Sequence, residues 1–167
     1  MDVKSQKDTF CRFTRVSRET ITSLVKYEKL LIDANKGLNL IGKSTINSIW
    51  SRHFLDSAQL IDLIDKNDQS ILDLGSGAGF PGLILAILAK DRKIRFKTIL
   101  VEKSSKKTKF LKKIITTLDL NVEIINKNIL KDEVNLAGDV FIARAFKPLG
   151  VILKLIHNNA KNWNKIF

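Results

Sequence analysis

An acidic residue and a glycine-rich loop stand together in the stretch from Ile71 to Ile87, which reads ILDLGSGAGFPGLILAI. Glycine has no Cβ, so such a loop lets the backbone approach a ligand closely, although ordering it costs conformational entropy. Asp73 precedes the glycines, and a second acid, Glu102, follows the next apolar run. One carboxylate can attract a cationic group and the other can accept hydrogen bonds from both hydroxyls of a ribose. These residues therefore predict a site for a charged nucleoside.

Several ligands must be compared for this loop. Gly77–Gly82 has the G-x-G-x-x-G spacing of a dinucleotide site, but such a site needs N–H groups at the helix start, and Pro81 has none. Gly37–Ser44 matches the phosphate-loop pattern, but it follows a helix-like segment and has a bulky apolar interior, so we interpret it as coincidence. S-adenosylmethionine has an ammonium, a sulfonium and a ribose diol but no phosphate, and it fits Asp73 and Glu102 best. The alternative is that both acids have purely structural roles: Asp73 would cap the loop, and Glu102 would pair with one of the lysines that follow it.

Elements of an α/β protein surround the loop. Helical periodicity predicts a helix from the N-cap Ser17 to about Asn35, ending near Gly37, and a second helical stretch, broken once, over Ile46–Ile64. Strands are predicted for Ser70–Leu74, Phe96–Glu102, Val122–Asn126 and Asp139–Ala143, and helices for Phe80–Lys90, Ser105–Leu118 and Leu149–His157. This alternation gives a parallel sheet whose ligands lie at the carboxyl ends of the strands. We expect a helical N-terminal extension over 1–67 and a Rossmann-like core over 68–167, forming one structural unit.

The composition is that of a globular domain with a strong positive charge. Lys and Arg number 29 against 17 Asp and Glu, and the net charge of +12 favours a polyanion such as nucleic acid, although AT-rich genomes also enrich lysine. The single cysteine, Cys11, excludes an internal disulfide and favours a cytoplasmic location. Two scattered histidines make a zinc site improbable, and neither a membrane span nor a secretory leader is expected.

Several motifs occur in the order and at the spacing of a known family. They are ANKGLNLIG at 34–42, RHFLDS at 52–57, DLGSGAGFPG at 73–82, KKTKFL at 106–111 and ARAF at 143–146. From about Val16 to the C-terminus the chain resembles the bacterial 16S rRNA guanine-N7 methyltransferase G family, also called the glucose-inhibited division protein B family. The resemblance implies a class I, Rossmann-like α/β fold with a parallel sheet flanked by helices. It also implies transfer of a methyl group from S-adenosylmethionine to N7 of one guanosine in 16S rRNA, free or in a small-subunit precursor.

The resemblance adds cofactor contacts to the acids and loop glycines. The complete predicted set is Asp73, Gly75, Gly77, Phe80, Glu102, Asn128, Ile129 and Arg144. Many members have a small residue followed by Glu where this chain has Asn128 and Ile129, so contact there would use backbone or apolar faces. Ala34 and Ile41 likewise replace a usual Trp and a usual Thr.

Methylation of guanine N7 needs no general base, because N7 already carries an in-plane lone pair. Catalysis would come from holding N7 and the methyl group in line within a dry site. Candidates for positioning the base or its phosphate are Asn39, Arg52, His53 and Arg144. A structural hydrogen bond from His53 to Asp56 or Asn39 is the alternative. The lysine run over 103–113 could grip RNA phosphates or be a solvated face.

The end of the chain carries a separate expectation. Members of the family continue further and complete the sheet, whereas a fifth strand would only begin at Asn162–Phe167. This predicts an open sheet edge at Asp139–Ala143 and a chain that is marginally stable or self-associating, with little or no methyltransferase activity compared with a full-length relative. The alternative functions are a truncated, inactive RNA-binding pseudoenzyme and a small-molecule methyltransferase. The sequence leaves the oligomeric state open.

Overall fold

The computed structural model describes residues 2–132, 134, 136–160 and 162–167. Its described part contains a parallel sheet with the strand order β3-β2-β1-β4-β5. The strands are β1 Ser70–Leu74, β2 Lys97–Val101, β3 Val122–Ile125, β4 Val140–Ile142 and β5 Lys165–Ile166. The order reverses between β1 and β4, so the topological switch point lies at the end of β1. The predicted strands are confirmed, and β1 has the predicted bounds.

The predicted open edge at Asp139–Ala143 is wrong. Strand β5 pairs with β4, with Val140 opposite Lys165 and Phe141 opposite Ile166. The pairing continues past the strands, because Ala143 N–H donates to the carbonyl oxygen of Phe167 at 3.0 Å. A two-residue strand is enough to satisfy the backbone groups of so short a neighbour.

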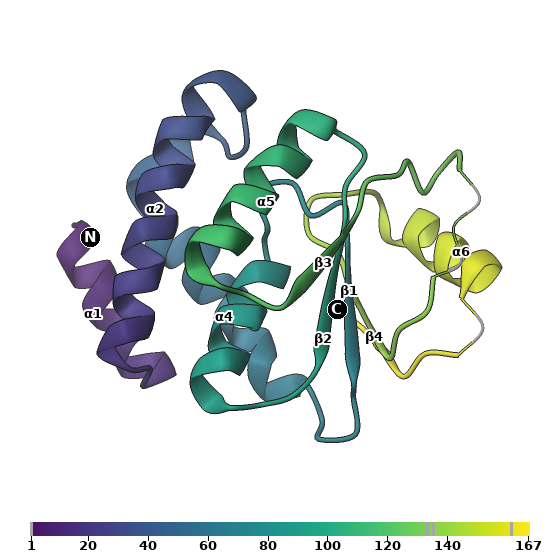
Figure 1. Ribbon diagram of the computed structural model, residues 1–167, viewed down its shortest axis with the longest axis horizontal. Coiled ribbons are helices and arrows are strands. Elements are labelled where there is room, and N and C mark those ends of the chain that lie inside the picture. The colour runs from purple at the N-terminus through teal and green to yellow at the C-terminus, as the bar shows by residue number, and fades with distance from the viewer. Residues whose placement is uncertain (1, 133, 135, 161) are drawn as a thin grey trace.

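Helices cover both faces of the sheet (Figure 1). Helices α4, Gly82–Arg92, and α5, Ser105–Leu118, pack on one face, and α6, Leu149–Asn159, packs on the other. The period-2 alternation of a strand divides the core accordingly. Ile71 of β1 belongs to the cluster under α4 and α5, whereas Leu72 and Leu74 belong to the cluster under α6. None of the described helices is long and apolar enough to cross a membrane.

Two N-terminal helices form a further layer outside α4 and α5 (Figure 1). Helix α1, Val3–Thr14, was not predicted. Helix α2, Arg18–Leu38, starts as predicted at Ser17, whose hydroxyl accepts from Thr20 N–H at 3.2 Å. The helix ends at Leu38, close to the predicted Gly37. Asn39, and not a glycine, adopts the left-handed conformation that ends it.

The stretch predicted as one helix with a single break is more irregular. It consists of the 3₁₀ turns η1, Lys43–Ser48, and η3, Gln59–Leu63, the π-helical turn η2, Trp50–Leu55, and the short α3, Asp56–Ala58. Its aromatic residues are core, as predicted, since Trp50 and Phe54 are fully buried. A π turn widens the helix and changes which side chains face inward, an arrangement common at functional sites.

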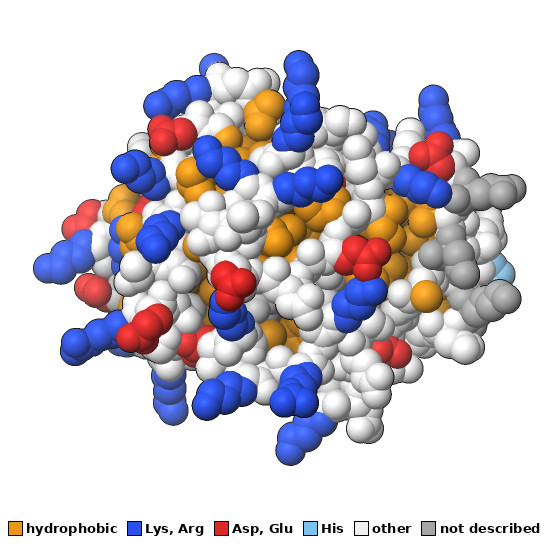
Figure 2. Space-filling view, in the orientation of Figure 1, with side chains coloured by type: hydrophobic (Ala, Val, Ile, Leu, Met, Phe, Trp, Pro, Cys, Tyr) orange, Lys and Arg blue, Asp and Glu red, His pale blue; other side chains and the backbone are white. Residues whose placement is uncertain are grey.

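Charged side chains spread over the surface, and Lys and Arg are prominent on the face seen in Figure 2.

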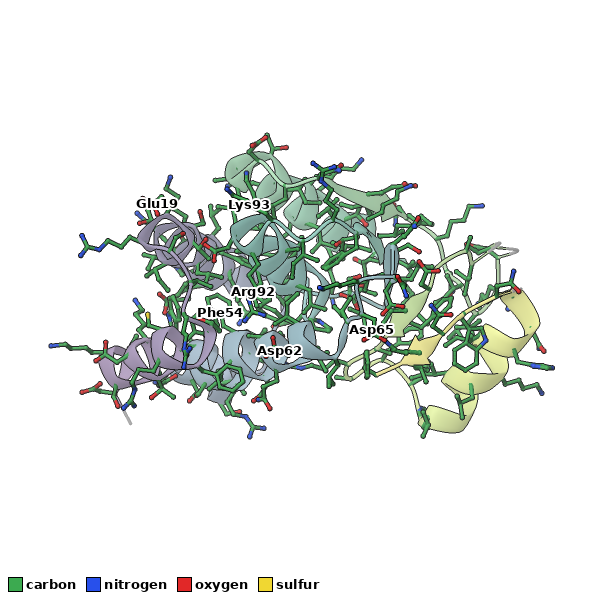
Figure 3. All side chains as sticks on the ribbon, turned by 90° about the horizontal axis from the view of Figure 1, so that it is seen from below. Glu19, Phe54, Asp62, Asp65, Arg92 and Lys93 are labelled. Atoms are coloured by element: carbon green, nitrogen blue, oxygen red, sulfur yellow. The ribbon has the colours of Figure 1, made fainter. Side chains whose placement is uncertain are left out.

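One ion pair links the irregular stretch over 43–63 to helix α4. Arg92, at the end of α4, and Asp62, in η3, approach each other in Figure 3, with Nη1 2.6 Å from Oδ1. This exposed pair adds little to the attachment, because the N-terminal helical segment packs on α4 and α5 through one shared buried apolar cluster.

Candidate cofactor and substrate site

A cavity of about 410 Å³ lies at the carboxyl ends of the strands, next to the switch point. Its volume is in the range of small-molecule binding sites. The glycine loop, Glu102, the segment 127–130 and the segment 144–147 line it. The N-terminal helical segment contributes residues 40–42 and His53 to the same wall. The site is therefore built jointly by the sheet and by the helical segment, from which Asn39, Arg52 and His53 were predicted; of these three, His53 lines the cavity.

The amides of the glycine loop donate to acceptors within the protein. Gly75 and Ser76 donate to the carbonyl oxygen of Val101 at 2.9 and 3.1 Å, and Gly77 donates to Glu102 Oε2 at 3.0 Å. At the start of α4, Gly82 N–H is bonded to Asp73 at 3.0 Å. A diphosphate would need such donors to point at the ligand. The amides of Gly75, Ser76, Gly77 and Gly82 are therefore not free to bind a diphosphate.

The phosphate-loop pattern at Gly37–Ser44 does not form a phosphate cradle either. Its first residues belong to α2, and no strand precedes it in the described chain. Asn35 Oδ1 accepts from the amides of Leu40 and Ile41 at 2.6 and 2.9 Å. The interpretation of this match as coincidence is confirmed.

Glu102 occupies the end of β2 and faces the cavity while it is only 6% exposed. Its Oε2 accepts from Gly77 N–H, and its Oε1 accepts from Ser104 N–H at 2.8 Å. Each carboxylate oxygen retains a further lone pair. The carboxylate is thus fixed by two backbone donors and can still accept the two hydroxyls of a ribose.

Asp73 does not line the cavity, so the direct contact that the sequence predicted between Asp73 and a cationic ligand is not available in this structure. It is completely buried, its Oδ2 accepts from Gly82 N–H, and its Oδ1 has no hydrogen-bond partner among the described residues. Burial raises the pKa of this carboxyl to about 7; the Gly82 hydrogen bond and the Arg144 charge oppose the rise, and the Glu102 charge adds to it. Asp73 fixes the start of α4 from below, so its effect on a bound cation is electrostatic and acts at a distance.

The segment after β3 supplies an apolar wall. Ile129 is 5% exposed and lines the cavity, as expected for contact through an apolar face. Asn128 also lines the cavity, but its backbone N–H donates to Asp132 Oδ2 at 2.7 Å. A backbone contact from Asn128 to a ligand would therefore need its carbonyl group or a change in this turn.

Arg144 and His53 meet at the wall of the cavity. Arg144 Nη2 donates to His53 Nδ1, and His53 Nε2 lies 2.9 Å from Thr45 Oγ1. The alternative partners predicted for His53, Asp56 and Asn39, are wrong. Phe80 lies beneath both groups: its ring centroid is 5.1 Å from that of His53, and the guanidinium carbon of Arg144 is 5.8 Å from it. The structure thus brings together three of the predicted site residues.

The other two positioning candidates lie outside the cavity wall. Asn39 is exposed and ends α2 with a φ of 46°. Arg52 is exposed as well, but it is close enough for its charge to lower the pKa of both His53 and Arg144. Neither residue is buried against the site as His53 is.

Sequence reasoning missed residues that shape the site from outside the loop. Tyr27 of α2 donates to the carbonyl oxygen of Ala78 at 2.5 Å and so anchors the glycine loop to the N-terminal helices. Phe146 packs over Gly75, where a Cβ would stand 2.2 Å from its ring. The ARAF motif contained Phe146, but nothing in the sequence indicated which face it covers. Thr45 carried no signal at all.

Lysines from separate segments surround the cavity: Lys103, Lys107, Lys127 and Lys147. In the described chain none of these forms an ion pair, whereas Lys90, Lys97 and Lys165 elsewhere do. Of the predicted lysine run, therefore, only part faces the site. Lys106 is next to Lys107 on α5 but does not line the cavity, and Lys112 and Lys113 are exposed and lie farther along the helix.

Comparison with known proteins places these features in one family. A family model described as rRNA small subunit methyltransferase G matches residues 20–167. The chain belongs to this family. Proteins named ribosomal RNA small subunit methyltransferase G are 39% identical over 153 residues in Pelagibacter ubique (strain HTCC1062) and 45% identical over 139 residues in Jannaschia sp. (strain CCS1). The alignments cover 90% and 83% of this chain but 71% and 65% of the relatives, so the chain spans about two thirds of their length.

Solved structures of methyltransferases share the fold of this family member. Coclaurine N-methyltransferase, bound to N-methylheliamine and S-adenosylhomocysteine, aligns with a TM-score of 0.54 at 16% identity, over 98% of this chain and 57% of its own. A methyltransferase from Thiobacillus denitrificans, in complex with S-adenosyl-L-homocysteine, aligns with a TM-score of 0.53 at 16% identity, over 82% and 52%. The predicted Rossmann-like class I methyltransferase fold is confirmed.

Proposed function

We propose that this family member transfers a methyl group from S-adenosylmethionine to N7 of a guanosine in 16S rRNA, in the cytoplasm. The observation that carries the proposal is the cavity at the switch point. It joins Glu102, whose oxygens remain able to accept hydroxyl groups, to a loop whose glycine amides donate within the protein and are not free for phosphate. The names of the relatives supply the substrate class, and the lysines around the cavity suit a polyanion.

The residues present fit the proposed cofactor. Glu102 would hold the ribose diol, Gly75 and Gly77 would allow close approach, and Ile129 would supply an apolar surface for the adenine. Arg144 lines the cavity and has five N–H donors, of which one on Nη2 is bonded to His53 and those of Nη1 are enclosed, so its remaining N–H groups can serve an oxygen of the ligand. Bound there, S-adenosylmethionine supplies a methyl group carried on a sulfonium sulfur.

The chain has little covalent chemistry to perform in this reaction. The N7 lone pair forms a bond to the methyl carbon as the carbon–sulfur bond breaks, and its electron pair returns to sulfur. The protein must hold the guanine edge in line and keep water out, which can account for several kcal/mol of the barrier. Arg52 and Asn39, both exposed near the cavity wall, are proposed to contact the RNA backbone.

Three functions can be separated by three measurements: methyl transfer, cofactor binding and RNA binding. Labelled S-adenosylmethionine and hypomethylated 16S rRNA should give labelled RNA, and calorimetry should show binding of S-adenosylhomocysteine but not of NAD. RNA binding without label transfer would instead indicate a pseudoenzyme. Cofactor binding without salt-dependent RNA binding would indicate a small-molecule methyltransferase. Tighter binding of NAD than of S-adenosylhomocysteine would overturn the cofactor assignment.

Glu102→Ala should weaken S-adenosylhomocysteine binding by roughly 1–3 kcal/mol, the range for losing a hydrogen bond to a charged group. Calorimetry measures the change, and Glu102→Gln is the matched control because it keeps the shape and one acceptor oxygen. The affinity of Glu102→Gln should fall between those of the wild type and Glu102→Ala. Wild-type affinity in Glu102→Ala would remove Glu102 from the binding site.

The lysines of α5 that lie nearer the cavity should contribute to the salt dependence of RNA binding. Lys106→Ala with Lys107→Ala should lower the magnitude of d log K/d log[salt] by about 1–2, if each lysine neutralises a phosphate. Lys112→Ala with Lys113→Ala removes the same charge from the far part of the same helix and should change the slope less. Equal slopes in the wild type and in the 106/107 variant would show that these lysines are merely solvated.

A further inference from the structure

The contact between Arg144 and His53 begins a chain of hydrogen bonds that runs in one direction. An arginine guanidinium has donors only, so His53 Nδ1 must accept the proton from Arg144 Nη2. At the other end, the Thr45 hydroxyl donates to the carbonyl oxygen of Gly42 at 2.8 Å. The hydroxyl proton is therefore committed, and Thr45 Oγ1 accepts from His53 Nε2 at 2.9 Å. Both ends fix the same tautomer, in which Nε2 carries the proton.

The surroundings of His53 keep the ring neutral. The side chain is 7% exposed and stacks on Phe80 with an angle of 14° between the rings. The charged groups near the His53 ring are Arg144 and Arg52. Those near the Arg144 guanidinium are Asp56, Arg52 and Asp73. Burial, and then the charges of Arg144 and Arg52, lower the pKa of His53 to about 4. A protonated ring would also have no lone pair for Arg144.

A ring in this state cannot act on the substrate directly. One nitrogen is occupied by Arg144 and the other carries its proton to Thr45, so neither offers a lone pair as a general base. Arg144, by contrast, lines the cavity and uses one of its five N–H donors on His53. Its Nη1 is enclosed, so the donors left for a ligand are the second N–H of Nη2 and the N–H of Nε. The guanidinium thus keeps donors available while His53 fixes its position over Phe80.

We propose that His53 is a positioning residue, a neutral acceptor that holds Arg144 at the cavity wall so that the remaining N–H groups of Arg144 meet an oxygen of the ligand. The proposal rests on the function proposed above and extends it by giving His53 a role through Arg144. The oxygen has one chemistry, that of a hydrogen-bond acceptor, and two sources: the cofactor carboxylate or the carbonyl group of the target guanine.

The first test is nitrogen NMR of the histidine rings, which needs no activity. The chain has two histidines, so His157→Asn assigns the signals. His53 should show the Nε2-protonated tautomer at pH 7 and keep it from pH 8 to about pH 5.5, whereas an unperturbed ring would titrate near 6.5. The Nδ1-protonated tautomer, or a midpoint near 6.5, would overturn the proposal whether or not the chain methylates RNA.

The second test separates positioning from general support of the fold. His53→Ala should lower kcat/KM on hypomethylated rRNA by about 10–100-fold, the scale of a misplaced positioning group. In an Arg144→Ala background the same change should have no further effect, because the residue it positions is gone. Penalties that multiply would contradict the proposal. The same cycle on the Kd of S-adenosylhomocysteine shows the source of the oxygen: a penalty there indicates the cofactor, and a penalty confined to kcat/KM indicates the guanine.

A milder pair of variants guards against misfolding. Thr45 does not line the cavity, and Thr45→Val keeps its shape but removes the acceptor for His53 Nε2. We expect Thr45→Val to lower kcat/KM by about 3–10-fold, the size of one lost hydrogen bond, and Thr45→Ser to restore it. Equal activity of Thr45→Val and Thr45→Ser, both folded by their melting curves, would show that the relay does not position Arg144.

Discussion

Gly75→Val should abolish binding of S-adenosylhomocysteine. Gly75 has a φ of +75°, which a β-branched residue adopts only at a high cost, and a Cβ there would stand 2.2 Å from the ring of Phe146. The valine would push Phe146 from its place on the cavity wall and occupy the approach space of the loop. Calorimetry should show an affinity at least about 100-fold lower, equivalent to about 2.7 kcal/mol. Binding within tenfold of the wild type would contradict the assignment of this loop.

Because Gly75→Val also strains the fold, Gly77→Ala provides the matched variant. Gly77 has a φ of +56°, but the nearest atom to its Cβ would be the carbonyl oxygen of Gly75, at 3.8 Å. The fold should lose only the cost of a left-handed alanine, about 1–2 kcal/mol, as a melting curve can show. Gly77 lines the cavity, so the methyl group should still lower the affinity for S-adenosylhomocysteine. A folded Gly77→Ala with unchanged affinity would mean that the ligand does not approach the loop closely.

Asp73 should make the stability of the chain fall as the pH rises. Its pKa in the folded chain is about 7, against 3.8 for an ordinary aspartate, so the folded state binds more protons between these values. The stabilisation linked to this group is fully present below pH 3.8 and is lost as the pH rises through 7. At about 1.4 kcal/mol for each pH unit, the loss amounts to about 3–5 kcal/mol.

Asp73→Asn isolates this contribution. The amide oxygen can still accept from Gly82 N–H, but the side chain no longer ionises. We expect the difference in free energy of unfolding between Asp73→Asn and the wild type to grow in favour of the variant from pH 4 to pH 7, and to level off above. Urea unfolding at a series of pH values measures it. A difference that is constant with pH would show that Asp73 is ionised in the folded chain throughout this range.

The elements of the sheet could be predicted because each carries a local signal. The buried run of β1 and the amphipathic pattern of α5 gave the bounds Ser70–Leu74 and Ser105–Leu118 that the structure has. The prediction for residues 43–63 was wrong because the secondary structure of this stretch depends on tertiary packing. Trp50 and Phe54 turn into the core through a π turn, which no periodicity in the sequence indicates. Helix α1 was missed because its pattern is largely polar, and the pairing of β5 with β4 was missed because β5 is only two residues long.

Part of the site could be predicted because a suitable side chain directly follows a strand, as the carboxylate of Glu102 follows β2. The site was not predictable where contact depends on distant segments. The hydrogen bond between His53 and Arg144 joins residues 91 positions apart, and Thr45 becomes part of the site only because η1 folds beside η2. The burial of Asp73 was hidden for a related reason: its strand position suggested the cavity, but the pleat turns it towards α4.

The central claim is that this family member methylates N7 of a guanosine in 16S rRNA. The most direct measurement incubates the chain with labelled S-adenosylmethionine and 16S rRNA that lacks the modification, with the Pelagibacter ubique relative assayed in parallel. The RNA is then cleaved chemically at N7-methylguanosine and the position is mapped. We expect label at N7 of one guanosine, the same one in both reactions. Label at another atom or on another RNA, or no label where the relative transfers it, would contradict the account.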